Sequence, residues 1–432
     1  MSRRLERLIT DLGERSSYDA ASQCSRCGYC EQACPTYVAT GRESKSGRGR
    51  NQVVRLLLEG RLRDPEAAEE ALSTCLLCGA CTTACYAHVP TADLVLEGRR
   101  LLRGRPHWLV KALTRLLVAN PERLASLLKL ANAFKRAGLS RLGRPFLRLA
   151  GLGGLAEADE HVEEAPSEFL FEKLRGLPRP ERPRWLYFAP CGPNYLYPRV
   201  GLATVKGLEA LHGPGRFMEN SCCGLLCYNY GEIEDAKVLA KRCVERLEAL
   251  DASAGSGEPA DVVVDCSSCA AFMKSYPQLF VDDPAWRTRA ERFSSRIKDA
   301  VEAFDAPSLE RPASGVVVYH ESCRARHGQG LKAPAKLLGA AGASWRELPE
   351  ADVCCGGGGA FTFLHPELSD EVLRRKIGAI ASVGARRVLA SSTSCLIQLA
   401  RGLKKYYPDC TVEHVSEFFA GQSPNHGTKT GA

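Results

Sequence analysis

Eight cysteines of this chain fall into two copies of one spacing, and no other feature of the sequence constrains the fold as strongly. The first copy, CSRCGYCEQAC, runs from Cys24 to Cys34, and the second, CLLCGACTTAC, runs from Cys75 to Cys85. Each copy reads C-x2-C-x2-C-x3-C. Three thiolates on a short loop can bind three corners of a cubane cluster, and in two-cluster ferredoxins the fourth cysteine of each run binds the other cluster. The doubled run therefore predicts two 4Fe-4S clusters.

Cross-ligation between the runs divides the eight thiolates into two sets. One predicted cluster is held by Cys24, Cys27, Cys30 and Cys85, and the other by Cys75, Cys78, Cys81 and Cys34. The alternative is a pair of zinc sites with four cysteine ligands each. Zinc sites usually draw on two C-x2-C pairs rather than on four cysteines in one run. The spacing therefore favours iron–sulfur clusters over zinc.

The segment between the two runs has the periodicity of helices. NQVVRLLLEGRL places its apolar residues at the spacing of a short amphipathic helix. A second helix is predicted after Asp64, a suitable N-cap, with Pro65 at its first position. We therefore expect residues 1–98 to form an all-helical ferredoxin domain that carries both cysteine loops.

From residue 185 onward the pattern changes, and short β-branched runs alternate with stretches of helical spacing. This alternation predicts parallel strands covered by helices. The C-terminal half also repeats itself, because one cysteine and one Cys-Cys-Gly triplet recur at a constant offset: Cys191, Cys222, Cys223, Gly224, and then Cys323, Cys354, Cys355, Gly356. Such register predicts two pseudo-symmetric α/β lobes, over residues 185–310 and 311–420. The fold class is thus α+β and multidomain.

Each lobe carries its own set of candidate metal ligands. The first lobe offers five thiolates and the second offers four, with Ser392 standing where the first lobe has Cys266: Cys191, Cys222, Cys223, Cys266 and Cys269, then Cys323, Cys354, Cys355 and Cys395. Adjacent cysteines cannot bridge each other without strain, but both can face one metal centre where Gly224 or Gly356 permits a sharp turn. Five thiolates exceed what one cubane needs and favour an iron–sulfur centre. Four fit a 4Fe-4S cluster or zinc, and a reversible thiol pair is a further alternative for either lobe.

Other residues near these cysteines carry weaker signals. The glycine run at 356–359 lacks the ending of a phosphate-binding loop, so we expect close backbone approach, with N–H groups donating to cluster sulfur. His320 and His327 flank Cys323 and have two interpretations, a hydrogen-bonding or proton-relay role at a cluster and a structural role. Three cysteines outside the patterns are predicted to be ordinary buried thiols: Cys227, Cys243 and Cys410.

The net charge of +8 comes from one segment. Residues 99–148 hold thirteen Lys or Arg against one acid, Glu122, in Leu-rich sequence of helical spacing. Three interpretations are open: helices packed on the lobes with solvated Arg faces, a docking surface for an acidic partner, or an amphipathic surface on an anionic membrane with Trp108 near the interface. Nucleic acid is not expected, because aromatic residues do not interleave with the basic ones. Residues 99–184 are assigned to these helices and a linker, and 421–432 to a disordered tail.

The sequence also bears on location. The N-terminus has no apolar signal segment, and no apolar run is long enough to span a membrane. Most of the twenty cysteines sit in metal-type spacings, which fits thiolates kept reduced in a cytosol. We therefore expect a cytoplasmic protein, either free or peripheral at the inner face of the cytoplasmic membrane.

Nearly the full chain resembles the iron–sulfur subunits of glycolate oxidase and anaerobic glycerol-3-phosphate dehydrogenase, and the D subunit of heterodisulfide reductase. The stretches that carry the resemblance are CSRCGYCEQACPTY, GRGRNQVVRLLLEG, CLLCGACTTAC, and the second-lobe segments YHESC, CCGGGGAFTFLHPEL and SSTSCLIQL. The second lobe is most similar to glycolate oxidase, whereas the five-cysteine first lobe is more similar to heterodisulfide reductase.

The resemblance implies an electron-transfer subunit of an oxidoreductase that is inactive without a flavoprotein partner. An FAD-containing dehydrogenase would oxidise glycolate, lactate or glycerol 3-phosphate, and electrons would pass through the clusters to a quinone or a disulfide. The heterodisulfide-reductase type implies a non-cubane 4Fe-4S cluster in the first lobe, with a candidate redox site at Cys222 and Cys223, whereas Ser392 leaves the second lobe one thiolate short. Two alternatives stay open: a heterodisulfide-reductase-like catalytic subunit, and a zinc-bearing scaffold that only binds partners.

Overall fold

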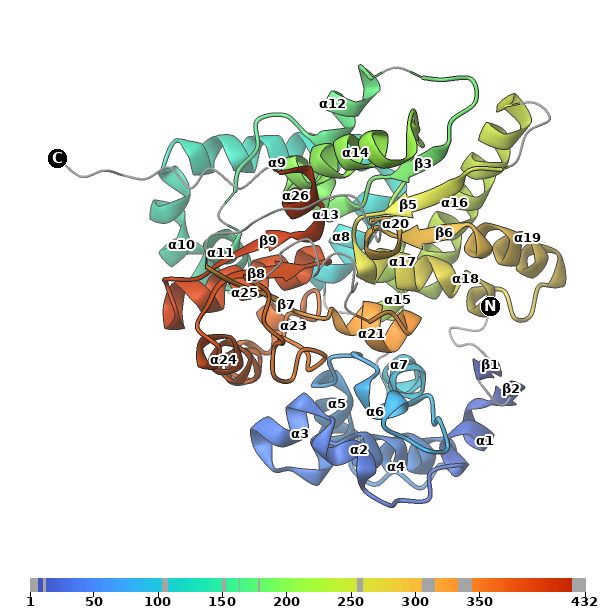
Figure 1. Cartoon of the computed structure of the whole chain (residues 1–432). Coiled ribbons are helices and arrows are strands. Elements are labelled where there is room, and N and C mark those ends of the chain that lie inside the picture. Colours follow the sequence, from blue (N-terminus) through green and yellow to red (C-terminus); the bar gives the residue numbers. More distant parts are fainter. Residues whose placement is uncertain are drawn as a thin grey trace.

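Helices dominate the N-terminal unit. The structure, a computed structural model, describes residues 7–10, 13–102, 108–149, 153–162, 164–177, 179–254, 259–304, 315–332 and 344–421. The longer helices of the unit are α1 (Ser17–Ser22), α4 (Gly47–Leu58), α5 (Pro65–Ser73) and α7 (Thr91–Leu102). Shorter ones lie between them: α2 (Tyr29–Gln32), α3 (Pro35–Thr40), η1 (Glu43–Lys45) and α6 (Ala80–Thr83). In Figure 1 this unit lies to one side of the two lobes, with α6 and α7 next to α21 (Cys323–Gln329).

The two helices predicted between the cysteine runs are confirmed. In α4, Val54 faces the core, and the helix packs against α7. In α5, the Asp64 carboxylate accepts a hydrogen bond from the backbone N–H of Ala67, and Pro65 occupies the first turn. The structure adds a small antiparallel hairpin, β1 (Arg7–Thr10) with β2 (Gly13–Ser16), to the expected helices. The hairpin forms because it docks on the first lobe, where Gln278 accepts from the backbone N–H of Ile9.

Each lobe is built on a parallel sheet, as the repeat predicts. The first sheet has the order β4 (Arg216–Phe217), β3 (Trp185–Phe188), β5 (Asp261–Val264), β6 (Ile297–Asp299), and the second has the order β7 (Val316–Tyr319), β8 (Ala385–Ala390), β9 (Thr411–His414). The strand registers match between lobes, because Tyr187 pairs with Val263 and Tyr319 pairs with Leu389. These pairs fall at equivalent positions of the repeat, so the pseudo-symmetry extends to the backbone pairing.

Helices cover the sheets on both faces, which explains why β3 and β7 consist of apolar and aromatic residues throughout. The first lobe contributes α14 (Pro198–His212), α16 (Ile233–Ala254), α17 (Ser267–Lys274), α18 (Tyr276–Leu279), α19 (Pro284–Ser295) and α20 (Ala300–Ala303). The second contributes α21, α23 (Phe361–Leu364), α24 (Pro366–Ser382), α25 (Thr393–Tyr406) and α26 (Val415–Ala420). One hydrophobic core draws Tyr187 and Val263 from the first lobe together with Tyr319 and Leu389 from the second. The two lobes therefore share a hydrophobic core and do not form two separate domains.

The basic middle segment consists of helices: α8 (Trp108–Ala119), α9 (Pro121–Arg136), α10 (Leu139–Leu149), α11 (Gly153–His161) and α12 (Leu170–Arg175). Part of its charge is used internally, because Asp159 pairs with both Lys135 and Arg144. Leu170 and Leu174 are buried in the shared core, so the stretch predicted as a linker contributes to packing. The side chain of Trp108 and the tail from residue 422 lie outside the described residues.

Two further features bear on where the molecule makes contacts. Helix α10 exposes large apolar side chains, with Leu142, Phe146 and Leu149 between 77% and 87% exposed. Among the described residues, no helix combines the length and the apolar character that crossing a membrane requires.

Candidate metal centres

The two N-terminal cysteine loops have the same backbone path. In each loop one residue between the first two cysteines and the glycine after the second cysteine have positive φ: Arg26 at 61° and Gly28 at 90°, Leu77 at 53° and Gly79 at 82°. Each glycine then begins a short helix that carries the third cysteine, Cys30 on α2 or Cys81 on α6. Two left-handed residues in four wind the chain tightly, and backbone N–H groups turn inward, as Leu77 N does toward Cys75 Sγ at 3.4 Å. The repeat of this strain at equivalent positions marks a functional loop.

The electrostatics of the thiols show which ones lie together. Burial raises the pKa of Cys81, and the thiolates of Cys75 and Cys34 raise it further. Burial also raises the pKa of Cys30 to about 11, with further contributions from Cys24 and Cys34. Cys34, the last cysteine of the first run, therefore lies close to the second run. Cross-ligation requires this placement, and the ligand assignment itself stays a prediction.

Gly47, at the start of α4, fits tightly between the two loops. A Cβ atom at Gly47 would lie 2.8 Å from the Cβ of Cys81 and 3.3 Å from the Sγ of Cys30. No side chain fits at this distance, so glycine allows helix α4 to contact both cysteine loops at once. In the sequence, NQVV belonged to a predicted helix and GRGRNQVV to a stretch that carries the resemblance, and neither assigned a role to Gly47.

A buried arginine on the same helix contacts the predicted cluster ligand Cys34. Arg50 is 1% exposed, and its Nη1 lies 3.6 Å from Cys34 Sγ. Its other donors bind the carbonyls of Ala71, in the last turn of α5, and of Thr74, the residue directly before Cys75. The guanidinium thus holds Cys34 and the backbone before the second loop together, and it brings a positive charge to the Cys34 sulfur. Arg50 lies on the core-facing side of α4, one helical turn before Val53 and Val54. A cation on the apolar face of a predicted helix was the sequence feature that could have indicated a buried functional arginine.

Replacing Arg50 with methionine is expected to lower the reduction potential of a cluster bound at Cys34 by on the order of 50 to 100 mV, because a nearby cation stabilises the more negative reduced state. Arg50→Lys keeps a charge and should shift the potential less. The measurement is an EPR-monitored redox titration of the full chain. Arg55→Met, on the solvent side of the same helix and paired with Glu59, is the matched control, and an equal shift there would contradict a local effect.

In the first lobe the five predicted thiols form one continuous group. The Sγ atoms of Cys223 and Cys269 lie 3.3 Å apart. A hydrogen bond with Cys269 lowers the pKa of Cys266 to about 5, and one with Cys222 lowers the pKa of Cys223 to about 6. A hydrogen bond with Cys222 raises the pKa of Cys191. The lowered pKa values of Cys223 and Cys266 favour the thiolate, which is the form that binds metal.

The second lobe repeats the group with four thiols. Hydrogen bonds between the thiols connect Cys323 with Cys354, Cys354 with Cys355, and Cys355 with Cys395. All four cysteines are free thiols. His320 also belongs to this cluster, because one of its ring nitrogens and the sulfurs of Cys355 and Cys395 all lie within 4.8 Å of one another. His327, the other histidine that flanks Cys323, lies away from this cluster. The His327 ring contacts the Thr83 hydroxyl at 3.1 Å and joins the second lobe to the N-terminal unit.

The glycines of the two Cys-Cys-Gly triplets adopt the left-handed turn that the sequence predicts. Gly224 has φ of 90° and Gly356 has φ of 85°. The backbone N–H of Gly224 lies 3.5 Å from Cys222 Sγ, and that of Gly356 lies 3.4 Å from Cys354 Sγ. A backbone N–H thus approaches a cysteine sulfur at both triplets, and donation to the sulfur of a cluster stays a prediction.

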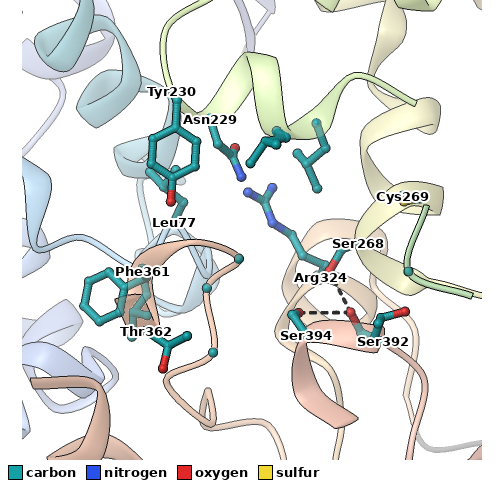
Figure 2. Close-up of a pocket in the computed structure, with 18 of the residues that line it drawn as sticks. Leu77, Asn229, Tyr230, Ser268, Cys269, Arg324, Phe361, Thr362, Ser392 and Ser394 are labelled. Atoms are coloured by element: carbon teal, nitrogen blue, oxygen red, sulfur yellow. Dashed lines mark hydrogen bonds between the residues drawn. The ribbon is translucent and has the colours of Figure 1, made fainter. Parts of the chain in front are cut away.

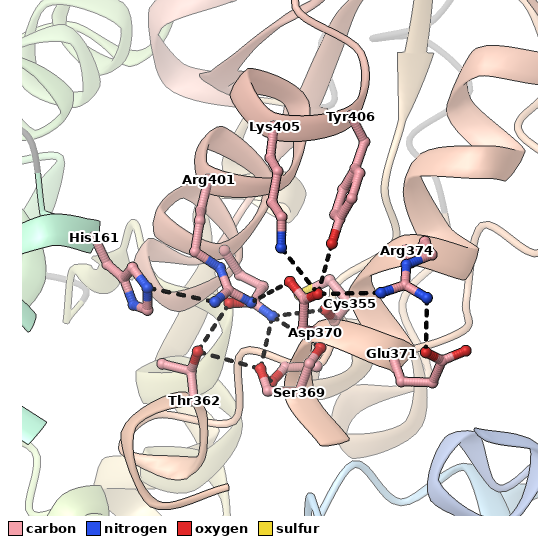
Figure 3. A network of polar contacts seen from close by, with 12 residues as sticks. His161, Cys355, Thr362, Ser369, Asp370, Glu371, Arg374, Arg401, Lys405 and Tyr406 are labelled. Atoms are coloured by element: carbon pink, nitrogen blue, oxygen red, sulfur yellow. Dashed lines mark hydrogen bonds and ion pairs between the residues drawn. The ribbon is translucent and has the colours of Figure 1, made fainter. Parts of the chain in front are cut away.

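A polar network supports the second triplet from behind (Figure 3). Ser369 Oγ donates to the carbonyl of Gly356 at 3.0 Å, and Gln398 donates to the carbonyl of Cys355 at 3.3 Å. Further out, Asp370 accepts from Tyr406 at 2.5 Å and pairs with Arg401. The turn that presents Cys354 and Cys355 is therefore held on its backbone side by side chains from α24 and α25.

Substituting Gly356 by alanine should lower the melting temperature by at least about 4 °C, because a Cβ there would meet the Ser369 carbonyl at 2.8 Å in a left-handed backbone. Thermal unfolding followed by circular dichroism measures the effect. Gly378→Ala is the control, since Gly378 lies inside α24 with open space around it, and it should be neutral or slightly stabilising. Equal melting temperatures for the two variants would contradict the tight turn.

All nine lobe cysteines line a single cavity of about 1050 Å³. The cavity also reaches Cys75 and Leu76 of the N-terminal unit and the basic side chains of Arg99 and Arg324. Figure 2 shows Arg324 extending from the second lobe toward Asn229 of the first, opposite a hydrogen-bonded row of Ser268, Ser392 and Ser394. The sequence predicted two pseudo-symmetric lobes, each with its own set of cysteines, and did not predict that the two sets surround one shared space.

The N-terminal unit meets this cavity at the second lobe. Burial and the thiolate of Cys323 raise the pKa of Cys78 well above its ordinary value. The glycine run packs against the same loop, because a Cβ at Gly358 would lie 2.9 Å from Leu76. The second cysteine run therefore lies next to the second lobe's cysteines. The three cysteines assigned to no cluster, Cys227, Cys243 and Cys410, are buried as predicted.

Comparison with known proteins agrees with this layout. A 4Fe-4S dicluster domain matches residues 20–89, and a cysteine-rich domain matches twice, over 185–274 and 317–400. The chain is 29% identical to the probable glycolate oxidase iron-sulfur subunit of Bacillus subtilis, over 93% of both chains. It is 26% identical to the glycolate oxidase iron-sulfur subunit of Escherichia coli, over 87% of this chain and 89% of the relative.

A shorter relative is more similar over the part that it covers. Lactate utilization protein A of an Exiguobacterium strain is 34% identical, across 96% of its own length and 54% of this chain. The matched domains account for both cysteine runs and both Cys-Cys-Gly triplets. The chain belongs to the family of oxidoreductase iron–sulfur subunits in which a 4Fe-4S dicluster domain is joined to two cysteine-rich domains.

Proposed function

We propose that this chain is the electron-transfer subunit of a flavin-linked dehydrogenase that oxidises a small hydroxy acid or glycerol 3-phosphate. The observation that carries the proposal is the continuity of the cysteine groups. The second N-terminal run lies beside Cys323, and the cavity lined by the second lobe's thiols is lined by the first lobe's thiols as well. Groups that must exchange single electrons need this kind of adjacency, and isolated metal sites do not.

The residues fit iron–sulfur clusters. Thiolates are soft ligands of the kind that such clusters take, and the lowered pKa values of Cys223 and Cys266 favour the thiolate form. In the N-terminal unit we assign one cluster to Cys24, Cys27, Cys30 and Cys85 and the other to Cys75, Cys78, Cys81 and Cys34. In the lobes we assign one centre to Cys191, Cys222, Cys223, Cys266 and Cys269 and one to Cys323, Cys354, Cys355 and Cys395. When bound, the clusters would supply one-electron transfer.

The names of the relatives support the class of electron donor. They are iron-sulfur subunits of glycolate oxidase and proteins of lactate utilization. We infer that an FAD-containing partner oxidises a 2-hydroxy acid such as glycolate or lactate and reduces the N-terminal unit. The final acceptor would be a quinone or a disulfide that reaches the cavity. Contact with the inner face of the cytoplasmic membrane would use α10, where Leu142 and Phe146 are exposed on a basic segment.

A second candidate function is favoured by the cavity itself. Its volume of about 1050 Å³ suits an organic substrate, and the five thiols of the first lobe open into it. In this proposal the chain is a catalytic subunit of the heterodisulfide-reductase type, with Cys222 and Cys223 at the redox site of a non-cubane 4Fe-4S cluster. A thiol substrate should then perturb the EPR signal of the first lobe, and Cys222→Ser should remove that response.

Metal analysis of anaerobically purified full chain tests the proposal. Two N-terminal clusters require about eight irons per chain, and clusters in the lobes raise the total to about twelve or sixteen, with equal acid-labile sulfide. A purified flavoprotein partner with glycolate or lactate should reduce these clusters. Zinc without sulfide in both lobes would favour a partner-binding scaffold instead, and fewer than about eight irons would contradict the N-terminal clusters themselves.

A further inference from the structure

The two lobes differ at two positions close to their thiol groups. Where the first lobe has Cys266, the second has Ser392. Where the first lobe has Phe188 at the end of β3, the second has His320 after β7. The strand registers fix this second equivalence, because the preceding residues Tyr187 and Tyr319 pair with equivalent strand positions. The lobe that lacks a thiolate therefore gains an imidazole.

Ser392 does not compensate for the lost thiolate, because its hydroxyl is engaged at the boundary between the lobes. Its Oγ lies 2.9 Å from the Ser268 hydroxyl and 3.6 Å from the Cys266 sulfur, both of which belong to the first lobe. In the second lobe it contacts Ser394 at 3.3 Å. The oxygen at this position thus serves the surroundings of the first lobe's thiols, and any further donor for the second lobe must come from another residue.

His320 has the properties of such a donor. It is fully buried, and neither Nδ1 nor Nε2 makes a hydrogen bond of good geometry within the part of the chain that the structure describes, although the backbone of Ala351 lies beside the ring. One ring nitrogen and the sulfurs of Cys355 and Cys395 lie within 4.8 Å of one another. Leaving a buried polar group unpaired costs about 1–3 kcal/mol. A metal bound by one ring nitrogen would reduce this cost. It would also explain why a polar ring stands where the first lobe has Phe188.

The distances suit a shared metal. Donor atoms on one tetrahedral ion are separated by roughly 3.3–3.8 Å, since metal–N and metal–S bonds are about 2.0–2.3 Å long. Small side-chain shifts bring three atoms within 4.8 Å of one another to that spacing. In the first lobe Cys266 approaches the equivalent pair, because its hydrogen-bond partner is Cys269, 3.3 Å from Cys223. The imidazole and the missing thiolate thus lie next to the same two cysteines in their respective lobes.

Counting donors separates iron–sulfur from zinc. A tetrahedral zinc ion takes four donors, as four thiolates or as three thiolates and one imidazole, so one of the lobe's five donors would have no bond to it. With His320 the second lobe has five donors, the same number as the first lobe. We propose that the second lobe binds an iron–sulfur cluster whose ligands are its four cysteines and the imidazole of His320. This inference rests on the proposed function, because it takes the lobes to be iron–sulfur sites.

Ligation by a neutral imidazole has a consequence for the electron path. Replacing thiolate by histidine raises the potential of an iron–sulfur centre, as in Rieske proteins. The second-lobe cluster should therefore have a higher potential than an all-cysteine cluster in the first lobe. Electrons that leave the second N-terminal run next to Cys78 would then meet the stronger electron acceptor first.

Pulsed EPR on the full chain labelled with 15N-histidine tests the ligand directly. All the other predicted cluster ligands are cysteines, so a strongly coupled imidazole nitrogen can only report His320. We expect this coupling in the native chain, its loss in His320→Phe, and its retention in His212→Asn, where the replaced ring contacts the Ala303 carbonyl far from any cysteine group. His320→Cys supplies a thiolate at the same place and should restore the iron that His320→Phe loses, without any imidazole coupling.

The outcomes separate this inference from the proposed function. Full iron and sulfide in both lobes without imidazole coupling would overturn the histidine ligand and leave the electron-transfer function standing. Coupling that survives in His320→Phe would overturn it as well. Zinc in the second lobe, or no metal in either lobe, would overturn the cluster assignment together with the ligand. Unchanged iron content in His320→Phe, with the nitrogen coupling lost, would still support ligation.

Discussion

Replacing Cys78 with serine is expected to cut electron transfer from the N-terminal unit to the lobes by at least about 100-fold, since the loss of even an outer partner of a metal ligand costs 10–100-fold. Cys78 is a predicted ligand of the second N-terminal cluster. Its thiol also lies within electrostatic reach of Cys323 and Cys354 in the second lobe. One substitution therefore removes both a predicted ligand and a thiol that lies near the second lobe's cysteines.

The measurement combines metal analysis with reduction kinetics. Iron should fall by about four per chain, the size of one cluster, while the cluster assigned to Cys24, Cys27 and Cys30 remains. Reduction of the N-terminal unit by a flavoprotein should then persist, whereas reduction of the lobes should fail. Cys410→Ser is the matched control, because Cys410 is buried at 4% exposure outside every cysteine group. Normal lobe reduction in Cys78→Ser would show that electrons enter the lobes elsewhere.

Local patterns in the sequence were sufficient to predict the two helices between the cysteine runs, the turns at the cysteines and the two lobes. The spacing C-x2-C-x2-C-x3-C fixes a loop geometry over eleven residues, and the structure shows the same left-handed turns in both copies. The Asp64–Pro65 start of α5 depends only on neighbouring residues. The constant offset between Cys191 and Cys323 predicted two lobes, because a repeated sequence folds into a repeated unit.

Contacts between distant segments could not be read in this way. The approach of Cys78 to Cys323 depends on how the N-terminal unit docks on the second lobe, and no periodicity within either segment encodes it. Arg50 reaches Cys34 only because α4 passes between the two cysteine loops. The loops are so close to the helix that only glycine fits at position 47. The role of His320 was open in sequence, since flanking Cys323 does not tell whether a ring points toward the thiols. In the structure the ring is buried and lies next to Cys355 and Cys395, and both of these are tertiary properties.

Substituting Cys223 by serine should abolish turnover with the final acceptor, by at least about 100-fold, while leaving the N-terminal clusters reducible. Cys223 is 3% exposed, 3.3 Å from Cys269, and its carbonyl accepts a hydrogen bond from the Tyr276 hydroxyl at 2.7 Å. It therefore holds a central and rigid place among the five thiols of the first lobe. Loss of one thiolate should release the iron of that lobe and spare the rest.

Comparing Cys223→Ser with Cys355→Ser, its equivalent in the second lobe, orders the two lobes along the path. If electrons cross the second lobe before the first, Cys355→Ser leaves both lobes oxidised in the presence of partner and hydroxy acid, whereas Cys223→Ser leaves the second lobe reduced. Tyr276→Phe removes the hydroxyl that supports the Cys223 carbonyl but no thiolate, so it should retain iron and most of the turnover. If the first lobe lies on the electron path, every electron must cross its thiol group before it reaches the final acceptor. Undiminished turnover in Cys223→Ser would therefore show that the first lobe lies off the path.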